Sequence, residues 1–173
     1  MDLETTTAAA HTSTLEELYV RHAPAGYRLA LLLTGDRALA EDILQDAFVR
    51  VVGRFGHLRG AASFDAYLRR TIVNLTKNTW RRRALERKHA DGWITPLDDI
   101  APADDAVAER LDVLRMLASL SERQRTAIVL RFYEDLAEDE IAAIMLCPAG
   151  TVRSLISRGV AALREEIGGH EHA

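Results

Sequence analysis

Two short helical patterns separated by a sharp break at Cys147-Pro148 constrain the fold of this chain more than any other feature, and both lie within residues 120–166. In the first pattern Leu136, Ile141, Ile144 and Met145 are the apolar positions. Acidic residues open it, where they suit the positive end of a helix dipole: Glu138, Asp139 and Glu140. This pattern predicts a short supporting helix that stops at the break.

The second pattern begins at Pro148, which suits a first helical position because its missing N–H would have no partner there. Its apolar stripe consists of Val152, Ile156, Gly159 and Leu163. The opposite face is basic and hydroxylated and consists of Gly150, Thr151, Arg153, Ser154, Ser157 and Arg158. A supporting helix, a tight turn and a helix with such a face predict a DNA-binding helix-turn-helix. An ordinary helical hairpin with a solvated charged face is the alternative that spacing alone leaves open.

Composition favours an all-α fold of one ordinary domain or two small ones, because alanine and leucine dominate the 173 residues and aromatic residues are few. The net charge of −4 predicts no global attraction to nucleic acid, so any DNA contact must use local basic patches. A single cysteine excludes an internal disulfide and suits a reducing cytoplasm. We expect no membrane span, catalytic residue, metal site or cofactor.

The N-terminal part begins with a polar stretch, residues 1–14, which we expect to be a disordered leader. Helical periodicity starts at Leu15, and Pro24 is expected to interrupt or start a helix. Thr34-Gly35-Asp36 then predicts the end of one helix and the cap of the next, over 37–52. The outer side of that helix carries an acidic face: Glu41, Asp42, Gln45 and Asp46. On composition alone this face is a solvated surface.

A glycine-bearing loop over 53–63 precedes a long helix with a core stripe of its own. Along the outer side of this helix runs a basic strip, whose members are Arg69, Arg70, Asn74, Lys77, Asn78, Arg81, Arg82 and Arg83. Such a strip can bind phosphates, and its amides can contact base edges. Basic residues also favour a helix C-terminus, which accounts for only a few of them. Trp80 either stacks on a base or packs at the helix end.

From these patterns we predict four parts of the chain: a leader at 1–14, a helical domain at 15–90, an acidic flexible linker at 91–108 and a second helical domain at 109–168. The linker contains two prolines and several aspartates, a composition typical of self-repelling connections.

Two segments, in this order, resemble one family. The stretch with LLTGD, QDAFVRV, AYLRR and WRRR is similar to region 2, and the stretch with EIA and GTV is similar to region 4, of bacterial extracytoplasmic-function sigma factors. The first is closest in detail to an actinobacterial branch of that family. Together the two segments cover about three quarters of the chain.

The resemblance implies a cytoplasmic protein, associated with the nucleoid when bound to polymerase, that directs core RNA polymerase to promoters. It assigns −10 recognition and melting to the basic strip and the 53–63 loop, −35 recognition to the helix-turn-helix, and polymerase docking to the acidic face. An anti-sigma factor is a further expected partner. The competing class of a stand-alone helix-turn-helix regulator explains the C-terminal part but not the acidic face, the loop and the strip.

Three positions depart from the family pattern. Leu146 replaces a turn glycine, Ala137 replaces a serine or threonine cap, and Leu155 replaces a common arginine. The first two predict a less stable helix-turn-helix, and the third places an apolar side chain near the DNA-binding face. Alternatively, Leu146 and Leu155 form part of an apolar patch that a partner covers.

Overall fold

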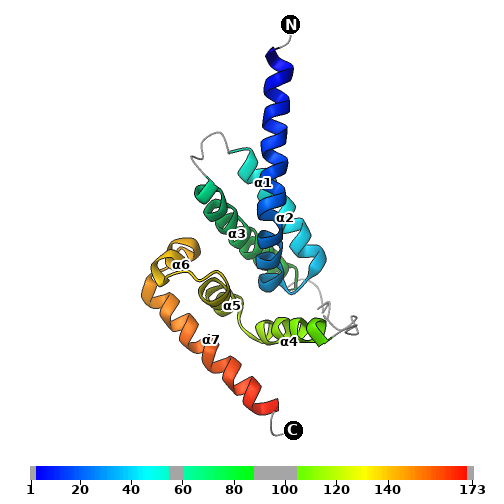
Figure 1. The fold of residues 1–173 in the computed structure, drawn as a ribbon. Helices are drawn as coiled ribbons and strands as arrows, with labels where there is room; N and C mark the ends of the chain where they lie inside the picture. The colour runs from blue at the N-terminus through cyan, green and yellow to red at the C-terminus, as the bar shows by residue number, and fades with distance from the viewer. Residues whose placement is uncertain (1–2, 55–60, 88–104, 171–173) are drawn as a thin grey trace.

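The computed structural model describes residues 3–54, 61–87 and 105–170, and within these ranges the protein is helical without any strand. An N-terminal module contains α1 (Leu3–Thr34), α2 (Arg37–Val52) and α3 (Ala61–Arg87). A C-terminal module contains α4 (Asp105–Ser119), α5 (Glu122–Ile128), the π-helical turn η3 (Val129–Tyr133), α6 (Glu138–Met145) and α7 (Ala149–His170). The start of α1 and the end of α7 lie at opposite ends of the molecule (Figure 1). The expected all-α class with two helical modules is confirmed.

The corner between α1 and α2 forms at Thr34-Gly35-Asp36, where the sequence predicts it. Gly35 has a left-handed φ of 68°. The Asp36 carboxylate accepts a hydrogen bond of 3.0 Å from the backbone N–H of Leu39, and it thereby caps α2. The reversal lets α1, α2 and α3 pack on one another. Fully buried side chains from all three helices, including Leu29, Ala47 and Phe64, form the centre of this module.

Two expectations about α1 differ from the structure. The helix begins at Leu3, so the segment expected to be a disordered leader is largely the first part of a 32-residue helix. Pro24 lies inside this helix and neither starts nor interrupts it. A proline removes one backbone hydrogen bond to the residue four positions earlier. That residue, Val20, is 69% exposed, so water can satisfy its carbonyl and the helix continues.

The two connecting segments lie only partly within the described residues. Residues 55–60 of the predicted 53–63 loop and residues 88–104, which include most of the predicted linker, lie outside them. α3 begins at Ala61 and α4 at Asp105, so each helix starts a few residues earlier than the sequence pattern predicts.

Capping residues set the boundaries of the C-terminal module. Ser121 and Gln124 form a reciprocal capping box at the start of α5. At its other end α5 continues directly into the π-helical turn η3, and after this turn Asp135 adopts a left-handed φ of 52°. This turn directs the chain into α6, and α7 then packs across α5 and α6.

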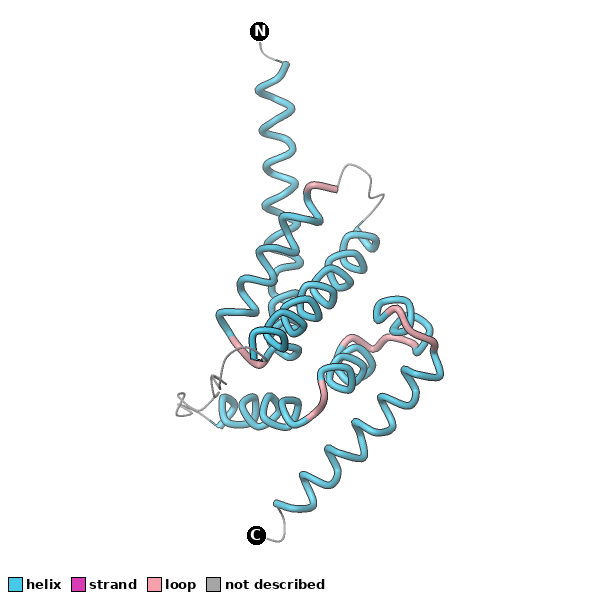
Figure 2. Tube along the Cα trace, turned by 180° about the vertical axis from the view of Figure 1, so that it is seen from behind, coloured by secondary structure: helices cyan, strands magenta, loops and turns pink. Residues whose placement is uncertain are grey.

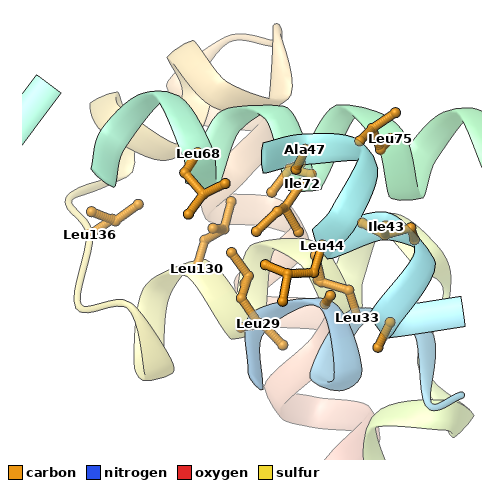
Figure 3. Close-up of a cluster of buried hydrophobic side chains, with 14 of the residues drawn as sticks. Leu29, Leu33, Ile43, Leu44, Ala47, Leu68, Ile72, Leu75, Leu130 and Leu136 are labelled. Atoms are coloured by element: carbon orange, nitrogen blue, oxygen red, sulfur yellow. The ribbon is translucent and has the colours of Figure 1, made fainter. Parts of the chain in front are cut away.

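The two modules contact each other. α5 lies between α3 and α7, as Figures 1 and 2 and the helix contacts agree. Leu130 of η3 and Leu136 in the following turn lie in one buried cluster with Leu29 and Leu68 of the N-terminal module (Figure 3). The described part of the chain therefore forms one continuous apolar core across both modules.

Candidate nucleic-acid and polymerase interface

The basic strip lies on α3, and most of its members are exposed. Arg70, Lys77, Asn78, Arg81, Arg82 and Arg83 are on the surface, and Asn74 is half-buried. Two of the arginines have carboxylate neighbours at 3.6 Å, Arg82 with Glu86 and Arg83 with Asp36. Ion pairs of this length between exposed side chains contribute little to stability. The six exposed members of the strip therefore lie where an incoming polyanion can reach them.

Arg69 is the exception in this strip, because its side chain is only 19% exposed. Its guanidinium pairs with Asp65 one turn earlier on α3 at 3.0 Å and with Glu134 in the turn after η3. Arg69 was predicted to lie with the other members along the outer side of the helix, but its side chain is largely covered. Asp65 is four positions away on the same helix, whereas Glu134 is 65 positions away in the sequence, so no local pattern could have shown the contact with Glu134.

A hollow of about 520 Å³ opens beside the strip, between the end of α2 and the first half of α3. Its lining includes Asn74 of the strip and three residues that were not among the predicted site residues, Arg50, Arg54 and Tyr67. The Arg54 guanidinium donates a hydrogen bond of 2.6 Å to the Tyr67 hydroxyl. The hollow lies where the described chain enters the 53–63 segment, and it combines an aromatic ring with cationic donors.

The acidic face lies on the outer side of α2, where Glu41, Asp42, Gln45 and Asp46 are all exposed. The buried side of the same helix carries Ile43, Leu44, Ala47 and Phe48. The predicted amphipathic arrangement is therefore present, and no ion pair joins the acidic face to another described residue.

The helix-turn-helix consists of α6, the turn at 146–148 and α7. On the outer face of α7, Gly150, Arg153, Ser154, Ser157 and Arg158 are exposed and Thr151 is half-buried. A β-carbon added at Gly150 would meet no atom within 4 Å, so this position leaves open space at the start of the helix. The opposite side buries Val152 completely and packs Gly159 against Ile128 of α5.

Arg153 is held by Glu138 at the start of α6. Its Nη2 and Nε atoms donate to one carboxylate oxygen at 2.8 and 3.1 Å. This hydrogen bond lowers the pKa of the Glu138 carboxyl and raises the pKa of Arg153. The pair therefore stays charged and fixes the direction of one cation on the proposed −35 surface. The sequence singled out both residues but did not predict their contact.

The three departures from the family pattern have different outcomes. Leu146 adopts the predicted left-handed conformation, with φ 54° and ψ 51°, and it is 67% exposed. Ala137 offers no side-chain cap, although the Glu140 carboxylate accepts a hydrogen bond of 2.8 Å from its backbone N–H. Leu155 is 6% exposed. The expectation that Leu155 lies near the DNA-binding face is wrong, because this position belongs to the buried side of α7, next to Val152.

Arg125 of α5 connects the two modules and was not identified from the sequence. Its guanidinium donates to the backbone carbonyls of Leu33, Ala118 and Leu120 at 3.0, 3.1 and 3.4 Å. It also lies 5.8 Å from the ring centroid of Trp80. Burial lowers its pKa. Trp80 is partly buried against the core, which favours packing over base stacking for this residue.

Both modules match described protein families. Residues 18–86 match sigma-70 region 2, and residues 110–163 match sigma-70 region 4. The RNA polymerase sigma-E factor of Streptomyces avermitilis is 38% identical over 163 residues, which cover 91% of this chain and 88% of that protein. The chain belongs to the sigma-70 family. It is an extracytoplasmic-function sigma factor, a class that is not enzymatic and that directs core RNA polymerase to promoters.

Other relatives agree with this assignment. The sigma factor SigE of Mycolicibacterium smegmatis is 35% identical over 164 residues, covering 90% of this sigma factor and 62% of that protein. Among solved structures, the sigma factor RpoE of Bartonella quintana, crystallised with the anti-sigma factor NepR, superimposes with a TM-score of 0.75 at 26% identity. It covers 88% of this chain and 96% of that one.

Two further properties of the described residues bear on the site. No group of three or more histidine, cysteine, aspartate or glutamate side chains is placed to hold a metal ion. No single helix is long and apolar enough to cross a membrane; the bent pair α6 and α7, at 102° to each other, meets that test only by length and composition.

Proposed function

We propose that this sigma factor divides promoter recognition among three surfaces. The strip on α3 contacts and opens the −10 element, the outer face of α7 contacts the −35 element, and the acidic face of α2 docks on core polymerase. The observation that supports this most directly is that each surface is exposed on a helix whose other side is buried in the core. Each of the three surfaces can therefore bind a partner while the buried side of its helix stays packed in the core.

The −10 surface suits melted DNA better than duplex DNA. Extruding a base costs a few kcal/mol, which stacking and hydrogen bonds in a pocket can offset. The hollow beside Asn74 provides the Tyr67 ring and the Arg54 guanidinium within one small volume. Along the rest of α3, Lys77, Arg81 and Arg82 follow at helical spacing and can track the phosphates of the opened strand.

The −35 surface combines two cations that are held in different ways. Glu138 fixes the direction of Arg153. The Arg158 Nε atom donates to the Ser154 backbone carbonyl at 3.2 Å, and Arg158 forms no ion pair with another of the described residues. Gly150 lets the backbone at the start of α7 approach the duplex closely. We assign base contacts to Arg153 and its neighbour Ser154, and phosphate contacts to Arg158.

Two proposals concern the cellular setting. As a sigma factor the protein acts in the cytoplasm, and we place it on the nucleoid whenever it is bound to polymerase. We also propose an anti-sigma factor as a partner, because the structurally similar RpoE was solved with one.

Permanganate footprinting of the holoenzyme on a responsive promoter tests the −10 assignment. Permanganate oxidises unpaired thymines, so reactivity reports melting. Arg81→Glu with Arg82→Glu should abolish reactivity around −10, because both side chains are exposed and their reversal repels the strand. Arg21→Glu with Arg164→Glu, a matched reversal of two exposed arginines outside the three surfaces, should leave it unchanged. Equal reactivity in both double variants would remove the strip from the melting mechanism.

A further inference from the structure

The pair between Glu138 and Arg153 uses one particular edge of the arginine. The Arg153 Nε and Nη2 atoms both donate to the same Glu138 oxygen, at 3.1 and 2.8 Å. A guanidinium carries its N–H donors in a fixed plane, and this contact takes the N–H groups that lie side by side along the Nε edge. The far end of the guanidinium, with an N–H from Nη1 and another from Nη2, lies outside the pair. Because the Arg153 side chain is 72% exposed, DNA can reach that end.

The backbone on both sides of this pair is held by the core. On α6, Glu138 lies one turn before Ile141, and Ile141 is fully buried. On α7, Arg153 directly follows Val152, which is fully buried as well. A long side chain on the outer face of a helix ordinarily keeps most of its rotamer freedom. Glu138 restricts that freedom for Arg153 before any DNA arrives.

General affinity for DNA does not explain a carboxylate at this position. The hydrogen bond from Arg153 lowers the pKa of the Glu138 carboxyl, and the charge of Arg131 lowers it further. Glu138 is therefore ionised at neutral pH. An ionised carboxylate beside a DNA-binding surface repels phosphates, so it lowers the affinity for every DNA sequence.

The end of the guanidinium that lies outside the pair matches one base edge of the major groove. Two parallel N–H donors need two adjacent acceptors, and guanine presents them as O6 and N7. Adenine places a donor beside its N7 acceptor, thymine offers one acceptor and cytosine a donor, so none of these bases accepts both N–H groups. A phosphate can pair with either edge of an arginine, but Glu138 already occupies the Nε edge of Arg153.

We propose that Glu138 is a positioning residue for −35 recognition. It holds the Nε edge of Arg153, so that this arginine points its far end into the major groove and contacts a guanine instead of a neighbouring phosphate. Sequence discrimination increases while general affinity decreases. This inference rests on the proposed function of α7 and deepens it, because it names the base and assigns a role to a residue of the supporting helix that acts through Arg153.

Selection from a promoter library with a randomised −35 element tests the inference on the complete holoenzyme. The wild type should prefer guanine at one position by about five- to 150-fold, which is the discrimination that a good bidentate pair gives. Glu138→Ala should lose most of this preference and should bind promoters with other bases there more tightly than the wild type does. In an Arg153→Ala background the same change should have no effect on that position, because Glu138 acts through Arg153.

Asp139→Ala is the matched control. Asp139 is the next residue of α6, is exposed, and raises the pKa of Arg153 through its charge, less than Glu138 does. Its removal should raise the affinity for all promoters of the library alike and leave the guanine preference intact. The slope of log affinity against log salt should steepen by about 0.9 in Glu138→Ala but not in Asp139→Ala, because the released arginine becomes one more phosphate contact.

A second variant guards against a loss of folding. Glu138→Gln keeps the size of the side chain and one acceptor oxygen, so its guanine preference should fall between those of the wild type and Glu138→Ala. An unchanged preference in Glu138→Ala, an equal loss in Asp139→Ala, or a preference of the wild type for another base at the position that depends on Arg153 would overturn the inference. A wild-type holoenzyme without base preference anywhere in the −35 element would instead refute the proposed function of α7.

Discussion

Replacing Leu155 by alanine tests whether this position on α7 is buried or exposed. Leu155 is 6% exposed and lies on the side of the helix that packs in the C-terminal module, beside the fully buried Val152. The truncation removes three carbon atoms from this contact and leaves the outer face of α7 unchanged.

The loss of stability follows from the burial. At about 0.8 kcal/mol for each buried methylene, three carbons contribute about 2.4 kcal/mol. The cavity that remains adds to this cost, and buried Leu→Ala changes fall between about 2 and 5 kcal/mol. We therefore expect a decrease of about 3 kcal/mol in the free energy of unfolding. For a chain of this size that corresponds to a decrease in Tm of about 6–12 °C.

Urea unfolding followed by circular dichroism measures the change. The control is Leu85→Ala, the same truncation at a helical position that is 61% exposed, where we expect a change within about 0.5 kcal/mol. If Leu155→Ala behaved like its control, Leu155 would be a surface residue. The assignment of the buried side of α7 would then be wrong.

Three other predictions follow from single features. Leu146→Gly should raise the free energy of unfolding by up to about 1 kcal/mol in the same assay, because glycine adopts the left-handed turn without strain; no gain would mean that the strain is relieved locally. Because Arg153 lowers the pKa of Glu138, carbon NMR should show this carboxyl titrating at a lower pH than an ordinary glutamate does, and the ion pair should be lost as the pH falls through that lowered pKa. Arg153→Gln should raise the pKa of Glu138 towards that of an ordinary glutamate. If the variant titrates as the wild type does, the pair does not form in solution. Asp42→Arg with Asp46→Arg should weaken binding to core polymerase about tenfold or more in fluorescence anisotropy without loss of helicity, and unaltered affinity would remove the acidic face from the docking site.

Sequence patterns predicted local features well where the cause is local. The left-handed Leu146 follows from its place in a helix-ending turn, and the Asp36 cap follows from the Thr34-Gly35-Asp36 signal. The exposed face of α7 follows from a period of 3.6 residues. Leu155 was misplaced because it lies at the edge of the apolar stripe, where one step of the period decides between core and surface.

The features that could not be predicted depend on contacts between distant segments. Glu134 and Arg69 are 65 positions apart, and the Arg125 bond to Leu33 spans 92 positions. Without a common motif, only the packing of the two modules brings such residues together. The helical conformation of residues 3–14 depends on extension from the packed part of α1, because propagating an existing helix is easier than nucleating one.

Run-off transcription from a genomic promoter library tests the central claim most directly. Core RNA polymerase alone should give background transcripts, and addition of this sigma factor should produce discrete new start sites. Those sites should share two sequence elements, at −10 and −35, one for each DNA-binding module. A transcript pattern that stays at the core-only level would contradict the account.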